Sequence, residues 1–200
     1  MWSEPVYRSS KRRKVRVSER GFSLMELMTV VVIVGVLSAV AVPTFSNYIY
    51  KARATEAIDF LSVIRLREES YRSEFGAYCS TLGASGNQVS SLNSHSNLVP
   101  DPSTTKRDPK PFVPTGPWNQ LGARPTEQVR FGYGVAAGDP SQALAQNIGF
   151  TAANVDFWFV ARAVGDLDAD DKYCTFEIYS ASKNVWLGDS DGNPLNKGWE

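Results

Sequence analysis

The feature that most restricts this chain is an apolar run at residues 22–42, directly after a short basic segment. Four of its 21 residues are polar, and Glu26 is the only charged one. A helix of this length measures about 31 Å, close to the ~30 Å hydrocarbon core of a bilayer. A buried core helix is the alternative, but the valine-rich residues 30–34 have no polar face. We therefore predict that this segment inserts into a membrane.

Charge is divided unevenly along the chain, although its 200 residues have a formal net charge of zero. The first 21 residues hold seven basic and two acidic side chains, which leaves 14 basic and 19 acidic side chains in the remainder. Basic residues before an apolar run favour a cytoplasmic N terminus and an exported body. An acidic body repels polyphosphates, so we expect no nucleic-acid partner.

The residues after Pro43 predict that the helix continues as an amphipathic half, with a kink at the proline. No proline occurs between residues 44 and 78, and apolar side chains recur at steps of three and four. That apolar stripe comprises Ile58, Leu61, Ile64, Tyr71, Phe75 and Tyr78. We expect one long helix with an apolar first half and an amphipathic second half.

The rest of the chain predicts a loop followed by a small antiparallel sheet. Residues 80–126 are rich in Ser, Gly and Pro and are interpreted as a loop. A loop of this length is uncommon in a compact domain unless it is functional or contains short helices or strands. Residues 129–135, 155–164, 173–180 and 184–187 have strand-like composition and short spacings. The predicted class is α+β, with the apolar face of the sheet on the stripe of the helix. The boundaries are 1–21 for the leader, 22–50 and 51–79 for the helix halves, 80–126 for the loop and 127–200 for the sheet.

The head of the helix carries a recognisable motif. Residues 20–28 read Arg-Gly-Phe-Ser-Leu-Met-Glu-Leu-Met, and an apolar run containing Pro43 follows. This pattern resembles the type III signal of type IV pilins and pseudopilins. The resemblance implies a pilin fold, cleavage between Gly21 and Phe22 by prepilin peptidase, N-methylation of Phe22 and assembly into a filament. Gly21 has no side chain, so a protease can approach the backbone there closely.

Glu26 is unusual because a carboxylate at the centre of a membrane helix costs up to ~3 kcal/mol, and such residues commonly have a function. After cleavage, the amine of Phe22 lies four residues from Glu26. By family resemblance, the amine of one subunit pairs with the Glu26 of a neighbour and sets the register of the filament. The alternative is a carboxylate that extends to the lipid headgroups.

The resemblance implies a structural subunit of a type IV pilus or related filament, and a minor pilin is one form of this. Its partners would be other pilin subunits, prepilin peptidase and an inner-membrane assembly platform. It would reside in the inner membrane before assembly and then in a periplasmic or surface filament. One alternative is a type II secretion pseudopilin. The other is a conventionally secreted binding protein cleaved after Ala41, because Ala39-Val40-Ala41 fits a small-residue cleavage site.

The two cysteines both lie in the part predicted to be exported, where disulfides form. Cys79 follows the stripe of the helix, and Cys174 alternates with Phe176 and Ile178 on the expected inner face of a strand. We predict a Cys79–Cys174 disulfide that ties the sheet to the helix. The alternative is two free buried thiols.

Carboxylates cluster near the C terminus, where Asp166, Asp168, Asp170, Asp189 and Asp191 alternate with other residues. Several oxygen ligands near glycine turns suit calcium, which takes six to eight oxygens. Turn chemistry is the alternative, since Asp, Asn and Gly favour turns. Calcium is the only cofactor that the sequence suggests.

The sequence gives little support for catalysis. His95 is the single histidine and lies in the predicted loop. A nucleophile-histidine arrangement would have to use it, and no phosphate loop, dinucleotide motif or zinc-ligand spacing occurs. We therefore expect a protein that is not an enzyme.

Overall fold

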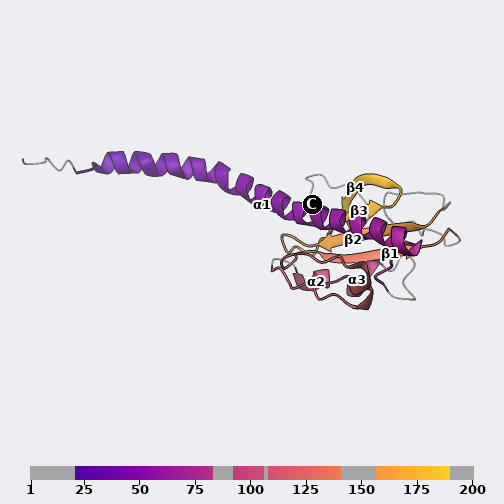
Figure 1. Ribbon diagram of the computed structural model, residues 1–200. Helices are drawn as coiled ribbons and strands as arrows, with labels where there is room; N and C mark the ends of the chain where they lie inside the picture. The colour runs from indigo at the N-terminus through magenta and orange to yellow at the C-terminus, as the bar shows by residue number, and fades with distance from the viewer. Residues whose placement is uncertain (1–20, 83–91, 106–107, 141–155, 190–200) are drawn as a thin grey trace, which may run out of the picture. The chain divides into compact units, whose positions relative to one another are not determined.

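The computed structural model describes residues 21–82, 92–105, 108–140 and 156–189. Its principal elements are one long helix, α1 (Leu24–Phe75), and four strands (Figure 1). The chain divides into two compact units, residues 1–43 and 44–200.

Helix α1 begins with a side-chain cap. The backbone N–H of Glu26 donates to the Oγ of Ser23 at 3.2 Å, which is the first half of a capping box. The helix contains Pro43 without ending there, as the sequence predicts. It ends at Phe75 because Gly76 adopts a left-handed φ of 77° and donates its N–H to the carbonyl of Arg72 at 2.8 Å. The predicted helical position of Tyr78 therefore lies beyond the helix.

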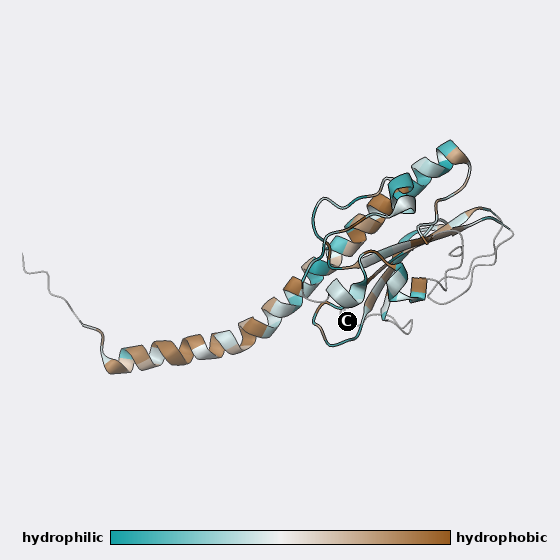
Figure 2. Ribbon diagram, turned by 90° about the horizontal axis from the view of Figure 1, so that it is seen from below, coloured by the Kyte–Doolittle hydropathy of each residue, from teal (hydrophilic) through white to brown (hydrophobic). Residues whose placement is uncertain are grey.

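The first unit consists of the apolar half of α1 in the described residues. This half includes an apolar stretch long enough to cross a membrane, and no residue of that stretch is buried within the chain. Figure 2 shows hydrophobic residues following one another along this stretch. By length and composition, this is the one helix in the described part of the chain that can cross a bilayer.

The second unit contains an antiparallel sheet with the order β1-β2-β3-β4. The strands are β1 (Gly132–Gly138), β2 (Trp158–Gly165), β3 (Cys174–Tyr179) and β4 (Ser182–Asp189). All four predicted strands are present, although β1 starts three residues later than predicted and β4 is longer than the predicted 184–187. The α+β class is confirmed.

One face of the sheet packs on the amphipathic half of α1. The buried helix residues are Ala54, Ala57, Phe60, Leu61, Ile64 and Glu68. They meet alternate strand residues, which include Tyr133 and Val135 from β1, Phe159 and Ala161 from β2, and Phe176 and Ile178 from β3. The alternation follows from the two-residue period of a strand.

The segment that the sequence predicts to be a loop contains a 3₁₀ turn (His95–Asn97), α2 (Pro102–Thr105) and α3 (Gly116–Leu121). Its α3 packs beside α1 on the first face, where Trp118 and Leu121 join the same core cluster as Phe60. Its earlier part, residues 92–105, covers the other face of the sheet. Leu92 and Leu98 pack on the second face, against Val160 and Val164. A Cβ on Gly134 would lie 2.7 Å from Leu98 and 2.8 Å from Leu92. The glycine in β1 therefore lets the segment approach the sheet closely.

Candidate functional site

The predicted cleavage residues lie directly ahead of α1. Gly21 and Phe22 are exposed, and a Cβ built on Gly21 would have no heavy atom within 4 Å. Substitution of Gly21 would therefore meet no steric conflict in the described fold. The assigned cleavage and methylation positions stay predictions, because this geometry shows access and no more.

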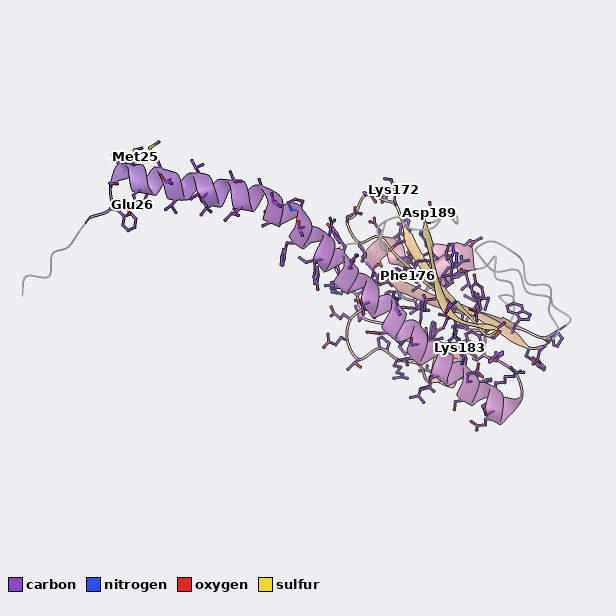
Figure 3. The ribbon with its side chains drawn as sticks, turned by 90° about the horizontal axis from the view of Figure 1, so that it is seen from above. Met25, Glu26, Lys172, Phe176, Lys183 and Asp189 are labelled. Atoms are coloured by element: carbon purple, nitrogen blue, oxygen red, sulfur yellow. The ribbon has the colours of Figure 1, made fainter. Side chains whose placement is uncertain are left out.

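Glu26 occupies the first turn of α1, and Figure 3 labels it there beside Met25. A carboxylate in this turn is favoured by the helix dipole, and its place three residues after Ser23 fits a capping box. The spacing thus predicts a second role for Glu26, as an acceptor for the N–H of Ser23, beside the predicted pairing with Phe22. Pairing with the Phe22 amine needs a charged carboxylate, whereas capping needs only a hydrogen-bond acceptor.

The apolar half of α1 presents side chains on every side of the helix. The exposed large apolar residues here are Leu24, Met25, Leu27, Met28, Val30, Val31, Val32, Ile33, Val34, Val36, Leu37, Val40 and Val42. A surface of this extent marks a membrane or protein contact rather than a water-facing element. Gly35 also has open space around it. Another helix could approach closely at that glycine.

The predicted disulfide is wrong in this structure, because Cys79 and Cys174 are free and buried. Tyr78, which directly precedes Cys79, packs its ring against that of Phe159 in β2, with centroids 4.9 Å apart. Cys174 instead pairs with Gly165, which lies six residues, or about 20 Å, from Phe159 along β2. A disulfide needs a Cα separation of about 4.4–6.8 Å. The sequence pattern does not show how far apart the two cysteines lie along the sheet, so it could not exclude the bond.

Both thiols are poor nucleophiles. Burial raises the pKa of Cys79 to about 11, and burial raises that of Cys174 to about 12. The Sγ of Cys174 donates to the carbonyl of Gly165 at 3.0 Å. The sulfur atoms therefore serve as packing groups in the described fold.

The acidic segment between β2 and β3 forms a tight turn around Asp166. Its buried carboxylate accepts backbone N–H groups from Ala169 at 2.7 Å, Asp170 at 3.3 Å and Asp171 at 3.1 Å. Ala169 and Asp171 have left-handed φ values of 64° and 67°. Asp166 therefore supports the turn by accepting its backbone donors.

Three of the predicted calcium ligands come together in this turn. One oxygen from each of Asp166, Asp168 and Asp170 lies within 4.8 Å of the others. Asp189 lies at the same end of the sheet, opposite the first residue of β3 (Figure 3). Asp191 lies outside the described residues. Calcium binding stays a prediction, and the hydrogen bonds above agree with the alternative of turn chemistry.

Sequence reasoning missed a buried carboxyl group on α1. Glu68 is fully buried, and its Oε2 accepts the backbone N–H of Cys79 at 2.9 Å. Its Oε1 has no hydrogen-bond partner among the described residues. Burial raises the pKa of Glu68 to about 8, and the nearby carboxylate of Glu69 adds to the increase. The spacing of four from Ile64 and three to Tyr71 could have located it on the apolar stripe.

A buried ion pair was also missed on the second face of the sheet. Arg162 of β2 and Glu177 of β3 lie directly opposite each other and form a buried salt bridge. Tyr179 donates its hydroxyl to Glu177, and Arg162 donates to Asn93 in the covering segment. The pair therefore joins the sheet to the segment above it. Its signal in the sequence is a charge at the centre of each apolar strand.

His95 lies in the 3₁₀ turn of that covering segment. Its ring centroid is 4.3 Å from that of Tyr173. The residue is partly buried and packs on this ring, whereas the sequence interpretation expected a solvated loop histidine.

Comparison with known proteins identifies the head of α1. A family model described as "Prokaryotic N-terminal methylation motif" matches residues 16–42. The match includes Gly21, Phe22 and Glu26 and ends at the close of the apolar run. The recognised resemblance is thereby confirmed for this segment.

Three similar proteins extend the comparison. The chain is 32% identical over 88 residues to "Prepilin peptidase-dependent protein D" of Escherichia coli (strain K12), covering 44% of this chain and 53% of that protein. It is 38% identical over 53 residues to a "Fimbrial protein" of Pseudomonas aeruginosa, covering 26% and 34%. It is 39% identical over 49 residues to "Type IV major fimbrial protein FimA" of Dichelobacter nodosus, covering 24% and 30%.

These matches span about a third to a half of the length of those proteins. Among solved structures, none gives a significant match to this chain. The family model therefore places the similarity at residues 16–42, and the relatives match 24–44% of this chain.

Proposed function

We propose that this type IV pilin-like chain is a structural subunit of a type IV pilus or a related filament. One observation carries the proposal: the methylation motif coincides with the apolar half of α1, which is long enough to span a membrane and is not buried within the chain. Such a helix requires an apolar environment before assembly and an equivalent one afterwards. Lipid supplies the first, and neighbouring copies of the helix supply the second.

The apolar half of α1 would supply most of the contacts between subunits. Side chains such as Leu27, Val31 and Ile33 would pack between helices, and Gly35 would allow close approach. Removal of the leader before Phe22 would create the ammonium group that neutralises the Glu26 of a neighbour. The structure leaves both residues in exposed positions from which that pairing is possible.

We place the chain among pilus subunits rather than secretion pseudopilins, and a minor pilin remains within this proposal. Two of the similar proteins are named as fimbrial proteins, which supports this choice. The name of the third describes dependence on prepilin peptidase, which supports that enzyme as a partner. Other pilin subunits and an inner-membrane assembly platform complete the proposed partners. The similar fimbrial proteins favour a structural role over a catalytic one.

The order of locations follows from the charges on the two sides of the apolar run. The basic leader would stay in the cytoplasm while the apolar half of α1 spans the inner membrane. After cleavage, extraction of α1 would transfer the subunit to a filament in the periplasm or at the surface. Secretion as a soluble protein would instead require cleavage after Ala41, within α1.

The mass of the natural N terminus tests this function directly. We expect the mature chain to begin at Phe22 with a methylated amine and to copurify with sheared filaments. Gly21→Leu should retain the leader, and Gly116→Leu provides a control because Gly116 also has open space around it. A mature chain that begins at Val42 would contradict the proposal and support secretion.

A further inference from the structure

A cleft of about 350 Å³ lies beside the amphipathic half of α1, between that helix and residues 124–130. We call it the α1 cleft. Its apolar lining includes Phe60 and Val63 from α1 and Pro125 and Val129 from the facing segment. Val63 is 40% exposed, so the lining is open to an incoming apolar group. A cleft of this kind suits a partially apolar ligand or partner.

The lining of the α1 cleft carries three carboxylates and two guanidinium groups. Arg130 donates its backbone N–H to Glu56 at 2.7 Å, and the two side chains form a salt bridge at 3.6 Å. The second guanidinium, that of Arg124, donates to the amide oxygen of Asn119 at 2.5 Å. In contrast, the exposed Asp59 and Glu127 have no salt bridge in the described part of the chain. An occupant with an apolar body and a cationic end would therefore complement the α1 cleft.

The same chain presents a surface of that chemistry at the start of the second unit. Phe45, Tyr48 and Lys51 recur at steps of three and form one ridge on α1. Phe45 is 68% exposed and Tyr48 is 75% exposed. Lys51 is also exposed, and no salt bridge to it occurs within the ranges that the structure describes. We call these three residues the aromatic ridge.

We propose that the aromatic ridge of one copy docks into the α1 cleft of a neighbouring copy. Tyr48 and Phe45 would cover the apolar lining, and the Lys51 ammonium would lie between Asp59 and Glu127. This inference rests on the proposed filament function and specifies one contact between its subunits. It joins exposed aromatic surface to exposed lining, and a cation to two carboxylates that lack one.

The arrangement cannot close within one copy, because the aromatic ridge and the helix side of the α1 cleft belong to the same helix. Tyr48 is 11 to 12 residues from the midpoint of Glu56 and Val63, or about 17 Å along α1. The two surfaces also differ, so the contact is heterologous. Repeating a heterologous contact extends an open polymer rather than closing a twofold dimer.

Disulfide trapping in cells tests the contact on the full chain. Tyr48→Cys combined with Gln128→Cys places one thiol on the aromatic ridge and one beside the α1 cleft. After mild oxidation, we expect a ladder of crosslinked multimers in sheared filaments. Tyr48→Cys with Lys183→Cys is the matched control, because Lys183 is exposed and lies on β4. The wild-type chain controls for its own two buried cysteines.

A charge exchange supplies the second readout. Lys51→Glu should lower filament yield by about tenfold, and adding Glu127→Lys should restore most of it. Lys183→Glu changes the same charge on β4 and should leave the yield unchanged. The mature chain of every variant should still begin at Phe22, because none of these changes touches the motif.

The outcomes separate the contact from the filament function. Filaments of normal yield from Lys51→Glu, or a ladder no stronger than the control, would overturn the docking and leave the filament function standing. Crosslinked dimers without higher multimers would overturn it as well, since they indicate a closed contact. A wild-type chain that is uncleaved and absent from filaments would overturn the proposed function itself.

Discussion

Two glutamates on α1 have opposite surroundings. Glu26 is exposed in the first turn, whereas Glu68 is fully buried near the end of the helix. Burial raises the pKa of Glu68, and the nearby carboxylate of Glu69 raises it further. The same residue type therefore has two different roles, and a glutamine variant at each position tests whether the role depends on charge.

Glu26→Gln separates register from capping. Glutamine can still take part in a capping box, but it cannot form an ion pair with an amine. We expect both Glu26→Gln and Glu26→Ala to insert into the membrane and to lower filament yield to a similar degree. Sheared-filament yield, normalised to membrane-bound subunit, is the measurement. Normal filaments from Glu26→Gln alone would assign the residue to capping.

Glu68→Gln should remove a pH dependence of stability. The pKa of Glu68 is about 8 in the fold and 4.5 for an unburied carboxyl. Between these values the folded chain binds more protons than the unfolded chain, so the free energy of unfolding decreases as pH rises. The slope is at most about 1.4 kcal/mol per pH unit. Glutamine keeps an acceptor for the N–H of Cys79 and does not ionise.

Urea unfolding of the full chain in detergent, from pH 4 to 8, tests this effect. We expect Glu68→Gln to be the more stable chain near pH 7.5, with the difference decreasing toward pH 4. Glu74→Gln is the control, because Glu74 is exposed on the same helix. Parallel pH profiles for Glu68→Gln and wild type would show that Glu68 is not the group responsible.

At the scale of elements, β1 depends on its glycines. A Cβ on Gly134 would lie 2.7–2.8 Å from two leucine side chains that cover the second face of the sheet. We expect Gly134→Ala to lower the free energy of unfolding by about 1–3 kcal/mol, because the covering segment must move. Gly116→Ala has open space and should change it little. Denaturant midpoints measure both, and equal midpoints would refute the packing argument.

The elements differ in how far the sequence predicts them. Helix α1 and the strands have long periodic patterns, so their existence and class were predictable. The turn and helices between residues 95 and 121 are three to six residues long, too short for a periodic signal. The disulfide failed for a related reason: alternation gives the face of a strand residue, but it does not give its level along the sheet.

The candidate site was predictable because its signal, like that of α1, is local in the sequence. Gly21, Phe22 and Glu26 are adjacent in sequence, so their motif needs no tertiary contact to be seen. Glu68 and the pair Arg162–Glu177 instead acquire their burial from segments far away in the chain. Their burial and their partners depend on tertiary packing, so their roles could not be predicted from the sequence.

At the scale of the whole molecule, the two units contribute unequally to stability. The buried core begins at Ala54, and none of its members lies in residues 21–43, the described part of the first unit. We expect a chain that starts at Thr44 to fold without detergent and, with Lys51→Glu to remove the proposed ridge–cleft contact, to be a monomer. Its free energy of unfolding should agree with that of the full chain in detergent to within about 0.5 kcal/mol. Sedimentation and urea unfolding measure these properties, and a molten or aggregated product would contradict this division.

Under the proposed filament function, the absence of core residues from the apolar half of α1 bears on the lifetime of a subunit. A filament that shortens would return its subunits to the lipid with the sheet and its covering segment already folded. Reuse would then require no chaperone and no new synthesis. The same molecules could pass through many rounds of extension and retraction, so the leader need be removed only once in the history of each chain.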